Sequence, residues 1–501
     1  MASTLLIGAR VVDPGAEPRP EPVEALEVDG AVVTWVGTAA AAAERPAGAV
    51  LDLDGVTLTP VFVDAHVHAT ASGLLADGLD LTCCRSPRAL LDAVAARAAA
   101  RPGALIWGHG WQEQEWAEPP PTRAELDRAA AGAPAYLSRI DVHSALVSSA
   151  LLDRAGDVAT AAGFSPGPLT TQAHHHARRA ALAAVDGPTR DAAQRAFLAD
   201  AAARGVGVVH ECAGPDISSV ADLAALLARP GPEVVGYWGE AVTGAAEVRE
   251  VLAATGARGL AGDLFVDGSI GSRTAALRVP YTDAPGCTGH LYLDQGGIAA
   301  HVAACTAAGV QAGFHVIGDA AADALLGGLR AAADRAGRPR RPHRVEHLEM
   351  LDPEQATELA ALGVVASVQP AFDACWGGAT GMYAERLGAA RARPMNPYAT
   401  LHAAGVTLAL GSDSPVTPVD PWGAVRAAVA HRTPGSGLLP MQALAAHTVG
   451  GHRAAGDRSP LAGRLAAGAP ASYAVWDGPG PLAGAATPRC LRTVHRGRTL
   501  H

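Results

Sequence analysis

Two histidines stand two positions apart at the end of an apolar run, in the stretch VFVDAHVHAT (61–70). Side chains alternate between the two faces of a β-strand, so His66 and His68 point to the same side and can bind one ion. Farther along the chain, His315, His347 and Asp413 each follow an apolar, strand-like run. Imidazole and carboxylate groups are the ligands typical of zinc sites that activate water. The order of these five residues therefore predicts a metal centre.

The chain contains no lysine, because all 39 of its basic residues are arginine. This composition excludes every mechanism that needs a lysine amine: Schiff-base chemistry, the phosphate-binding lysine of a P-loop, and a carbamylated lysine that bridges two metal ions. Histidine and carboxylate side chains must therefore supply the chemistry of the centre.

Composition narrows the class of protein further. Hydrophobic residues make up 49% of the 501 residues, the net charge of −10 is spread along the chain without basic clusters, and the seven cysteines are scattered. No apolar stretch approaches the roughly 18–20 residues that span a bilayer, and no secretory signal is visible. We therefore expect a cytoplasmic protein that acts on a small molecule, with neither nucleic acid nor membrane as partner. A homodimer is the default expectation for its assembly.

Strand-like runs alternate with Ala/Leu/Arg-rich helical patterns through most of the chain, which predicts a βα array around a parallel sheet. The expected inner strands end at AHVH, ALIWGHGW, GVGVVHE, EVVGYWGE, DLFVDGS, GVQAGFHVIGD, HRVEHLE, GVVASVQP and GVTLALGSD. These runs exceed the eight strands of a closed barrel, so some belong to insertions. Their polar residues stand at the carboxyl ends of the strands, where (β/α)₈ barrels build active sites.

Longer motifs run through nearly the whole chain: TPVFVDAHVH, RIDVHSALVSSALL, DLFVDGSIGSRTAAL, FHVIGDAA, HRVEHLEML, ASVQPAFDA, LALGSDSPVTPVDPW and GRLAAGAPASYAVWD. Together they resemble the amidohydrolase superfamily, in particular the amidohydrolase family 3 branch that contains N-substituted formamide deformylases. The resemblance implies an α/β fold: a distorted (β/α)₈ TIM-like barrel with a small β-sandwich domain formed by both termini. The sandwich would comprise residues 1–57 and 455–501, and the barrel residues 58–454 with an insertion at about 112–200.

The chain departs from this family at one position. Many relatives carry a carbamylated lysine, which bridges two metals, four residues before the aspartate of the DGS motif. Here that position is Asp263. Because an aspartate side chain is several bonds shorter, we expect it not to reach two ions, which predicts one divalent metal ion, in the first place Zn²⁺, with Fe²⁺ or Mn²⁺ as alternatives. A second ion would require Asp263, His210 or Glu211 to replace the bridge.

The expected mechanism uses a metal-bound hydroxide. His66, His68 and His315 are assigned as metal ligands, and Asp413 completes or approaches the shell and carries the proton from water to the leaving amine. His347 is either a further ligand or a hydrogen-bond donor to the developing oxyanion, oriented in that case by Glu346 or Glu349.

Other residues are candidates for supporting roles. Substrate contacts are predicted for Trp111, Arg139, His143, Arg273 and Trp376, and positions next to the ligands for His210, Glu211 and Asp263. An Arg in the pocket would suit a carboxylate or carbonyl of the substrate. The tract AHHHARR (173–179) is interpreted as a solvated helix surface and not as a metal site. Adjacent histidines of a helix point in different directions and cannot bind one ion together.

These features predict a hydrolase of non-peptide C–N bonds, acting on an amide or N-substituted formamide. One alternative is a mononuclear deaminase of a cyclic amidine, which release of ammonia would reveal. Another is a catalytically silent metal-binding sensor, against which the complete set of ligand positions argues.

Overall fold

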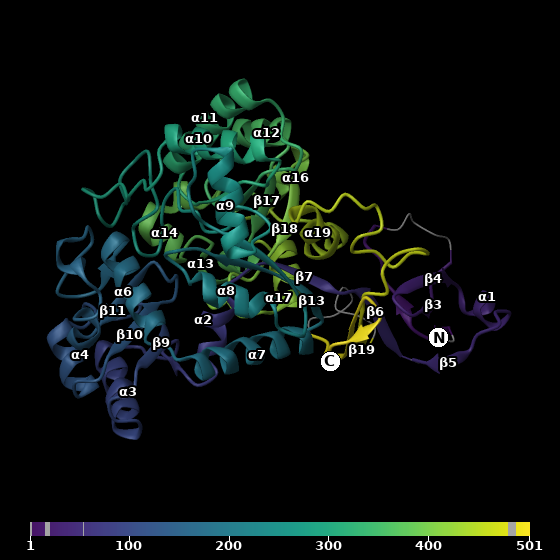
Figure 1. The fold of residues 1–501 in the computed structure, drawn as a ribbon, viewed down its shortest axis with the longest axis horizontal. Helices are drawn as coiled ribbons and strands as arrows, with labels where there is room; N and C mark the ends of the chain where they lie inside the picture. Colours follow the sequence, from purple (N-terminus) through teal and green to yellow (C-terminus); the bar gives the residue numbers. More distant parts are fainter. Residues whose placement is uncertain (1–2, 16–20, 54, 479–486) are drawn as a thin grey trace.

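Two parallel sheets form the centre of the computed structural model, which describes residues 3–15, 21–53, 55–478 and 487–501. One sheet has the order β14-β13-β7 and the other the order β15-β16-β17-β18 (Figure 1). Their bounds are β7 (Phe62–Val67), β13 (Val206–Ala213), β14 (Glu233–Trp238), β15 (Gly313–Val316), β16 (Arg344–His347), β17 (Val365–Val368) and β18 (Thr407–Leu410). Most of these strands are buried along their whole length, as the near-continuous apolar runs of the sequence predict for parallel strands covered on both faces.

Isolated parallel bridges connect the two sheets at both edges. Val67 pairs with Ser414, just after β18, on one side. On the other side, residues 259–265 lie between β14 and β15, through the bridges Tyr237–Gly259, Leu260–Ala312 and Phe265–His315. The stretch DLFVDGS (263–269) was expected to end a regular strand. Among the described residues, its pairing consists of the single bridge between Phe265 and His315. The carboxyl ends of β7, β15, β16 and β18 nevertheless point to a common region.

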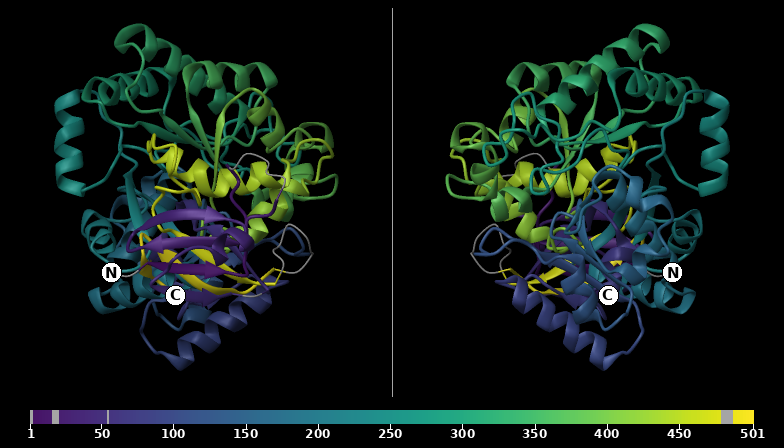
Figure 2. Two further views of the ribbon diagram at one scale, coloured as in Figure 1. Left: turned by 90° about the vertical axis from the view of Figure 1, so that its right-hand side faces the viewer. Right: turned by 90° about the vertical axis from the view of Figure 1, so that its left-hand side faces the viewer.

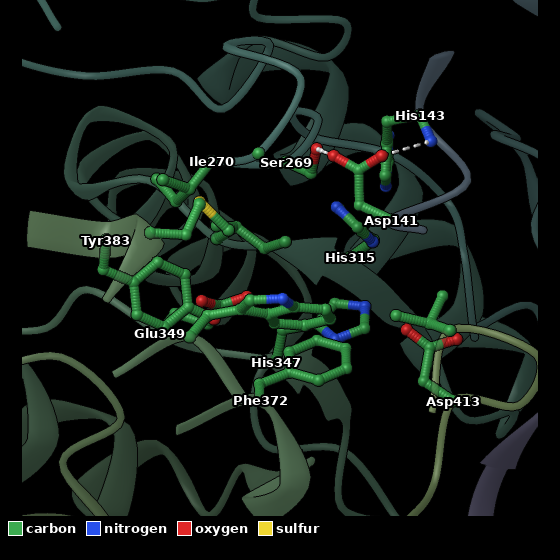
Figure 3. A pocket seen from close by; sticks show the side chains of 15 residues that line it. Asp141, His143, Ser269, Ile270, His315, His347, Glu349, Phe372, Tyr383 and Asp413 are labelled. Carbon is green, nitrogen blue, oxygen red and sulfur yellow. Dashed lines mark hydrogen bonds between the residues drawn. The ribbon is translucent and has the colours of Figure 1, made fainter. Parts of the chain in front are cut away.

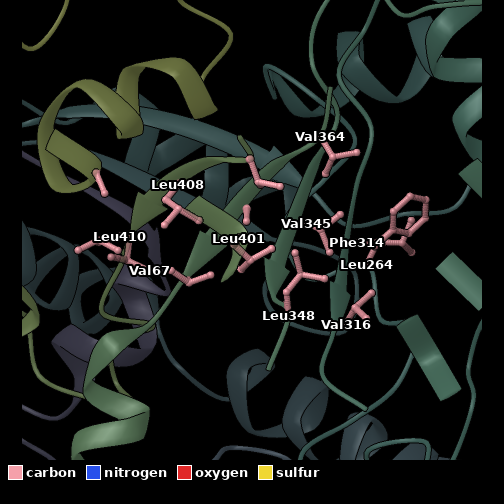
Figure 4. Packing of buried hydrophobic residues seen from close by; sticks show 14 of the residues in the cluster. Val67, Leu264, Phe314, Val316, Val345, Leu348, Val364, Leu401, Leu408 and Leu410 are labelled. Carbon is pink, nitrogen blue, oxygen red and sulfur yellow. The ribbon is translucent and has the colours of Figure 1, made fainter. Parts of the chain in front are cut away.

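Helices surround these sheets and complete the main hydrophobic core. Their bounds are α2 (Ala69–Leu74), α7 (Gly187–Ala203), α8 (Val220–Leu227), α9 (Ala245–Thr255), α10 (Gln295–Ala308), α11 (Asp319–Ala336), α12 (Pro353–Leu362), α13 (Pro370–Trp376), α14 (Met382–Leu387), α15 (Ala389–Ala392), α16 (Tyr398–Ala403), α17 (Pro421–Val429), α18 (Pro440–Ala445), the π-helical turn η2 (Ala446–Gly450) and α19 (Gly451–Ala454). Val345, Val364 and Leu408 belong to the buried cluster that fills the space between strands and helices (Figure 4). None of the helices in the described residues is both long and apolar enough to cross a membrane.

Both ends of the chain contribute to a pair of sheets beside this core. One sheet has the order β4-β3-β1-β5, and the other, β2-β6-β19-β20-β21, pairs β6 with β19 from the far end of the sequence. The bounds are β1 (Thr4–Ile7), β2 (Arg10–Val11), β3 (Ala25–Asp29), β4 (Val32–Gly37), α1 (Ala39–Ala43), β5 (Ala49–Asp52), β6 (Val56–Pro60), β19 (Tyr473–Asp477), β20 (Cys490–His495) and β21 (Arg498–Thr499). Leu6 and Leu26 of the first sheet share a buried cluster with Leu58 and Val475 of the second. Purple and yellow strands lie together accordingly (Figures 1 and 2).

A third region carries its own sheet, of order β12-β11-β10-β9-β8, at the opposite end of the molecule (Figure 1). We call it the insertion sheet. Its elements are β8 (Leu79–Asp80), α3 (Pro87–Ala100), β9 (Ile106–Trp111), α4 (Arg123–Ala130), β10 (Ala135–Arg139), β11 (Ser144–Val147), α5 (Ser149–Leu152), η1 (Asp157–Thr160), β12 (Leu169–Thr170) and α6 (Thr171–Ala183). The run ALIWGHGW was expected as an inner strand, but it forms β9 of this separate sheet. The sheet therefore begins at Leu79, before the expected start of the insertion near residue 112.

Candidate active site

Six chelating side chains meet at the carboxyl ends of the central strands. His66 is the last residue but one of β7, His315 lies on β15 and His347 ends β16. His68 directly follows β7, Asp413 follows β18, and Asp263 comes from the interrupted segment between β14 and β15. All six are buried. The five residues predicted from the sequence are thus together, and Asp263 has joined them.

Asp263 lies at the middle of this group. One carboxylate oxygen, Oδ1, is 3.4 Å from His66 Nε2, 3.4 Å from His315 Nδ1 and 3.7 Å from His347 Nε2. The other oxygen, Oδ2, is 3.2 Å from His68 Nε2. The sequence predicted that this aspartate would not reach two ions unless its strand moved. Residues 259–265 bring the backbone close to β15, which places the Asp263 carboxylate among the candidate ligands.

Asp413 closes the group on the side of β7. Its Oδ1 lies 3.5 Å from His66 Nε2 and 3.2 Å from His68 Nε2. Atoms that bind one ion tetrahedrally at about 2.0–2.2 Å stand about 3.3–3.6 Å apart. The spacings around Asp263 and Asp413 are therefore those of metal ligands, and they are longer than most direct hydrogen bonds.

The ligand atoms of these residues also lack hydrogen-bond partners among the described residues. This is true of His66 Nε2, His315 Nδ1, His347 Nε2, Asp263 Oδ1 and Asp413 Oδ1, all of which are buried. Buried polar groups without partners are rare and costly. A divalent cation would satisfy all five atoms at once, so the residues present fit a metal centre.

Hydrogen bonds on the far side of three rings leave the correct nitrogen free for an ion. His66 Nδ1 donates to Glu346 Oε2 at 2.9 Å, and His347 Nδ1 donates to Gln369 Oε1 at 2.7 Å. His315 Nε2 donates to the carbonyl oxygen of Gly268 at 3.2 Å. Such partners fix the tautomer of a metal-binding imidazole. Glu346 and Glu349 were the expected partners of His347, but Gln369 takes that place and Glu346 orients His66.

The electrostatics of the group show how strongly its members interact. Burial alone would lower the pKa of His68, but the carboxylates of Asp263 and Asp413 beside its Nε2 raise it to about 9. Burial would likewise raise the pKa of Asp263, yet the surrounding imidazoles hold it well below its usual range. The two carboxylates are therefore held in their ionised form among the imidazoles, as binding of a cation between these groups requires.

Backbone conformations at the site are unusual. His347 has φ +73° and Asp413 has φ +54°, both in the left-handed region that non-glycine residues seldom adopt. Such conformations cost of order 1–3 kcal/mol and gather at functional sites, where the surrounding structure enforces them. Here they turn both side chains at the ends of their strands toward the centre.

A hollow opens from the centre on the side of His315, His347 and Asp413 (Figure 3). Its walls include the carboxylates of Asp141 and Glu349, and we call it the carboxylate hollow. Phe372, Trp376, Met382 and Tyr383 give the hollow an apolar and aromatic wall. Burial raises the pKa of the Glu349 carboxyl to about 7. The hollow thus joins an apolar surface to the candidate metal centre.

Two of the predicted substrate contacts line this hollow, namely His143 and Trp376. Arg139 lies behind the wall, 2.8 Å from Glu113 and 3.1 Å from Asp141, so its charge is already paired. Asp141 also accepts hydrogen bonds from the hydroxyls of Ser269 and Ser272.

The structure does not bring Trp111 and Arg273 to the carboxylate hollow, which corrects that part of the prediction. Trp111 is buried in the core of the insertion sheet, where its Nε1 donates to the carbonyl of Leu137 at 2.8 Å. Arg273 is part-exposed and pairs with Asp283 at 2.6 Å. Each residue follows a strand-like run or family motif, but the run before Trp111 belongs to a different sheet.

His210 and Glu211 lie on β13, beside the ligands but with partners of their own. Arg344 donates to His210 Nδ1 at 3.1 Å and also contacts Glu346 at 2.6 Å, so this chain of contacts supports His66 from behind. Glu211 accepts the backbone N–H of Ala69 at 2.8 Å, and burial raises the pKa of its carboxyl to about 7. Their predicted position next to the ligands agrees with these contacts.

Two further features were not recognised from the sequence. Asp267 of the DGS motif accepts the N–H groups of Ala276, Ile317 and Gly318, at 2.8–2.9 Å, and so fixes the loop after β15. The tract 173–179 was interpreted as solvated surface, but His174 and His175 are buried on α6. That interpretation was wrong because α6 is covered on two sides. His174 shares a 2.8 Å hydrogen bond with Tyr136 of the insertion sheet, and His175 stacks on Phe265 and Tyr292.

The fold and this site define a metal-dependent hydrolase of the α/β class. A family model described as "Amidohydrolase family" matches residues 49–501, and the chain belongs to that family. It is 27% identical to "Putative amidohydrolase YtcJ" of Bacillus subtilis (strain 168), over 82% of this chain and 80% of that protein. It is 33% identical to the N-substituted formamide deformylase of Arthrobacter pascens, over 26% of each chain.

A solved structure also matches along almost the entire chain. It is an uncharacterized metal-dependent hydrolase from Pyrococcus furiosus, with 26% identity and a TM-score of 0.72, and the match covers 96% of this chain and 100% of that one. The resemblance to the amidohydrolase family inferred from the motifs is confirmed.

Proposed function

We propose that this protein hydrolyses a non-peptide C–N bond, in an amide or an N-substituted formamide. The observation that carries the proposal is the position of Asp263 and Asp413, which lie among four imidazoles at the mouth of a largely apolar hollow. The name of the Arthrobacter relative, N-substituted formamide deformylase, supports this bond type.

The metal would be held by His66, His68, His315, His347 and the two aspartates. A bound divalent ion, with zinc as the first choice for this donor set, supplies Lewis-acid polarisation of a carbonyl and lowers the pKa of water to about 7. Asp263 belongs to two groups of candidate ligands, one with His66 and His68 and one with His315 and His347. We propose that each group would hold one ion, in place of the single ion expected from the sequence.

Asp413 is the proton carrier of the proposed reaction. It lines the carboxylate hollow, its Oδ1 is buried without a hydrogen-bond partner among the described residues, and neighbouring imidazoles outweigh burial and lower its pKa. An ionised carboxylate at that position can take the proton of the attacking water and deliver it to the departing amine.

His143 would bind the substrate rather than the metal. Burial and the neighbouring His315 lower its pKa well below the usual value, so the ring is neutral at physiological pH. A neutral imidazole on the wall of the hollow can donate one N–H to the amide carbonyl. Phe372 and Trp376 would hold the apolar part of the substrate and exclude water.

We further propose that the two central sheets act as one distorted eight-position barrel, with residues 259–265 in the place of one strand. The bridges at both edges support this arrangement. The paired sheets at the chain ends would then be the small sandwich expected of residues 1–57 and 455–501, and the barrel would occupy residues 58–454.

One experiment tests both the reaction and the centre. The protein, loaded with Zn²⁺, is assayed for release of primary amine from a panel of N-substituted amides and formamides. Metal content is measured in parallel for the native chain and for Asp263→Asn. We expect amine release and about two ions per chain, falling to about one in the variant. Release of ammonia from a cyclic amidine instead, or no turnover at all, would contradict the proposed reaction.

A further inference from the structure

A second hollow lies on the other side of the candidate metal centre, where His68 forms part of its wall. Trp107, Tyr136 and Ser138 of the insertion sheet line it, together with Pro415. The charged side chain on this wall is Arg178 of α6, and we call the space the arginine hollow. None of the described residues that line it is an aspartate or glutamate.

Arg178 is buried, with 7% of its surface exposed, and no carboxylate of the described residues forms an ion pair with it. Its Nη2 donates to the carbonyl oxygen of Val142 at 2.7 Å. Across residues 3–15, 21–53, 55–478 and 487–501, no carboxylate oxygen lies within 4.0 Å of its guanidinium nitrogens. Two nearby arginines are paired: Arg139 with Glu113 and Asp141, and Arg179 with Asp216.

Two imidazoles beside Arg178 carry no compensating charge, and Asp216, whose charge also acts on Arg178, forms its ion pair with Arg179. Burial, together with the charge of Arg178, lowers the pKa of His174 well below its usual value and also lowers that of His175, so both rings are neutral near pH 7. Removing a cation from water without a counter-charge costs several kcal/mol in a folded protein. An anionic ligand that enters the hollow would supply the missing counter-charge and offset this cost.

We propose that the arginine hollow is an oxyanion-binding subsite, in which Arg178 receives a carboxylate or comparable oxyanion on the substrate. The assignment of the oxyanion to a substrate rests on the proposed function, because the hollow reaches the candidate metal centre at His68. The substrate class is then an amide with a negative charge at one end and an apolar group at the other. The aromatic walls of Trp107 and Tyr136 fit a flat or unbranched linker between the charge and the scissile bond.

The proton carrier decides which end of the substrate is charged. Asp413 lines the carboxylate hollow, and the amine that it protonates leaves on that side. The acyl part therefore enters the arginine hollow, where its oxyanion meets Arg178. A simple formyl group would leave this hollow unfilled, so the inference favours an amide of a dicarboxylic or similarly charged acid over a formamide.

The test measures binding rather than turnover, so that it does not depend on hydrolysis. Benzenesulfonate is titrated by calorimetry into the zinc-loaded protein, with methyl phenyl sulfone as an uncharged probe of nearly the same shape. Sulfonates bind divalent metals weakly, so affinity reports on Arg178. The native chain should bind the sulfonate, and Arg178→Gln should weaken this binding about tenfold to a hundredfold, as expected for hydrogen bonds to a charged group.

Two further variants make the result specific. Arg179→Gln is the matched control, because its arginine lies next along α6 and is paired with Asp216; it should bind the sulfonate like the native chain. Arg178→Lys keeps the charge and should bind at an intermediate level, which separates recognition from a folding defect. Equal binding of sulfonate and sulfone by the native chain, or equal binding by the native chain and Arg178→Gln, would overturn the inference. Failure to hydrolyse any amide would contradict only the proposed reaction.

Discussion

The two hollows beside the metal centre differ in the charge that each presents. The carboxylate hollow is lined by Asp141, Glu349 and Asp413, while its nearby arginine, Arg139, is taken up by Glu113 and Asp141 behind the wall. The arginine hollow presents Arg178 without a carboxylate partner among the described residues. The difference teaches that the pairing of an arginine, more than its position near a site, decides whether it is free to bind a ligand.

The largest expected effect concerns the acid of the carboxylate hollow. Asp413→Asn removes the proposed proton carrier while preserving the size of the side chain, and should lower kcat about 10²- to 10⁴-fold. Steady-state assays with an N-substituted amide would measure it. The control is Asp420→Asn, because Asp420 caps α17 through the N–H of Gly423 and asparagine caps helices equally well. Similar rates for the two variants would remove Asp413 from the mechanism.

The two arginines should differ sharply in what they contribute to stability. Arg139→Met leaves Asp141 buried without its cation and should lower the free energy of unfolding by about 3–5 kcal/mol, the usual cost of breaking a buried pair. Arg178→Met removes a charge that has no ion-pair partner within the described residues and should cost much less. Urea denaturation followed by circular dichroism would compare them. Equal losses would mean that Arg178 is as well paired as Arg139.

A third effect concerns selectivity between charged and neutral acyl groups. If the arginine hollow holds the acyl part, kcat/KM should be higher for a monoamide of a dicarboxylic acid than for its methyl ester. Arg178→Gln should reduce this ratio about tenfold to a hundredfold. Competition assays with both substrates in one reaction would measure the ratio directly. A ratio that the substitution leaves intact would place the charged end of the substrate elsewhere.

The smallest expected effect concerns the pH dependence of stability at Asp216, the carboxylate that pairs with Arg179. Burial alone would raise the pKa of Asp216, but the hydrogen bond with His175 and the charges of Arg179 and Arg178 lower it to about 2. The folded protein therefore holds the ionised form more strongly than the unfolded chain does. Its contribution to stability is complete above about pH 4 and is lost as the pH falls toward 2. Unfolding curves of the native chain and Asp216→Asn should differ at pH 6 and converge near pH 2.

The sequence alone predicted which chelating residues gather at the ends of regular strands. His66, His68, His315, His347 and Asp413 follow apolar runs, and strand periodicity with the carboxyl-end rule is sufficient to bring such residues together. The same logic did not reveal how close Asp263 lies to these residues, because residues 259–265 make single bridges and not a regular strand. How close such a segment approaches its neighbours depends on packing that periodicity does not describe.

The residues around the ligands were harder to predict. Gln369 stands at the end of the strand-like run ASVQP, so a signal was present, but any of several polar residues could have oriented His347. Trp111 was misplaced because its run looks like an inner strand and belongs to another sheet. Arg178 was not recognised because its helix was interpreted as surface. The burial of α6 depends on the insertion sheet, which packs against the helix. These errors concern contacts between regions distant in sequence.

One short turn is part of both walls. Val142 adopts φ +50°, which is strained for a branched side chain, and its carbonyl accepts the hydrogen bond of Arg178 in the arginine hollow. Its neighbours in the chain, Asp141 and His143, face the carboxylate hollow. A ligand that draws Arg178 away from this carbonyl loosens the restraint on a strained peptide, and the two side chains beside it must respond. The turn is therefore a mechanical link through which the occupant of one hollow affects the fit of whatever enters the other.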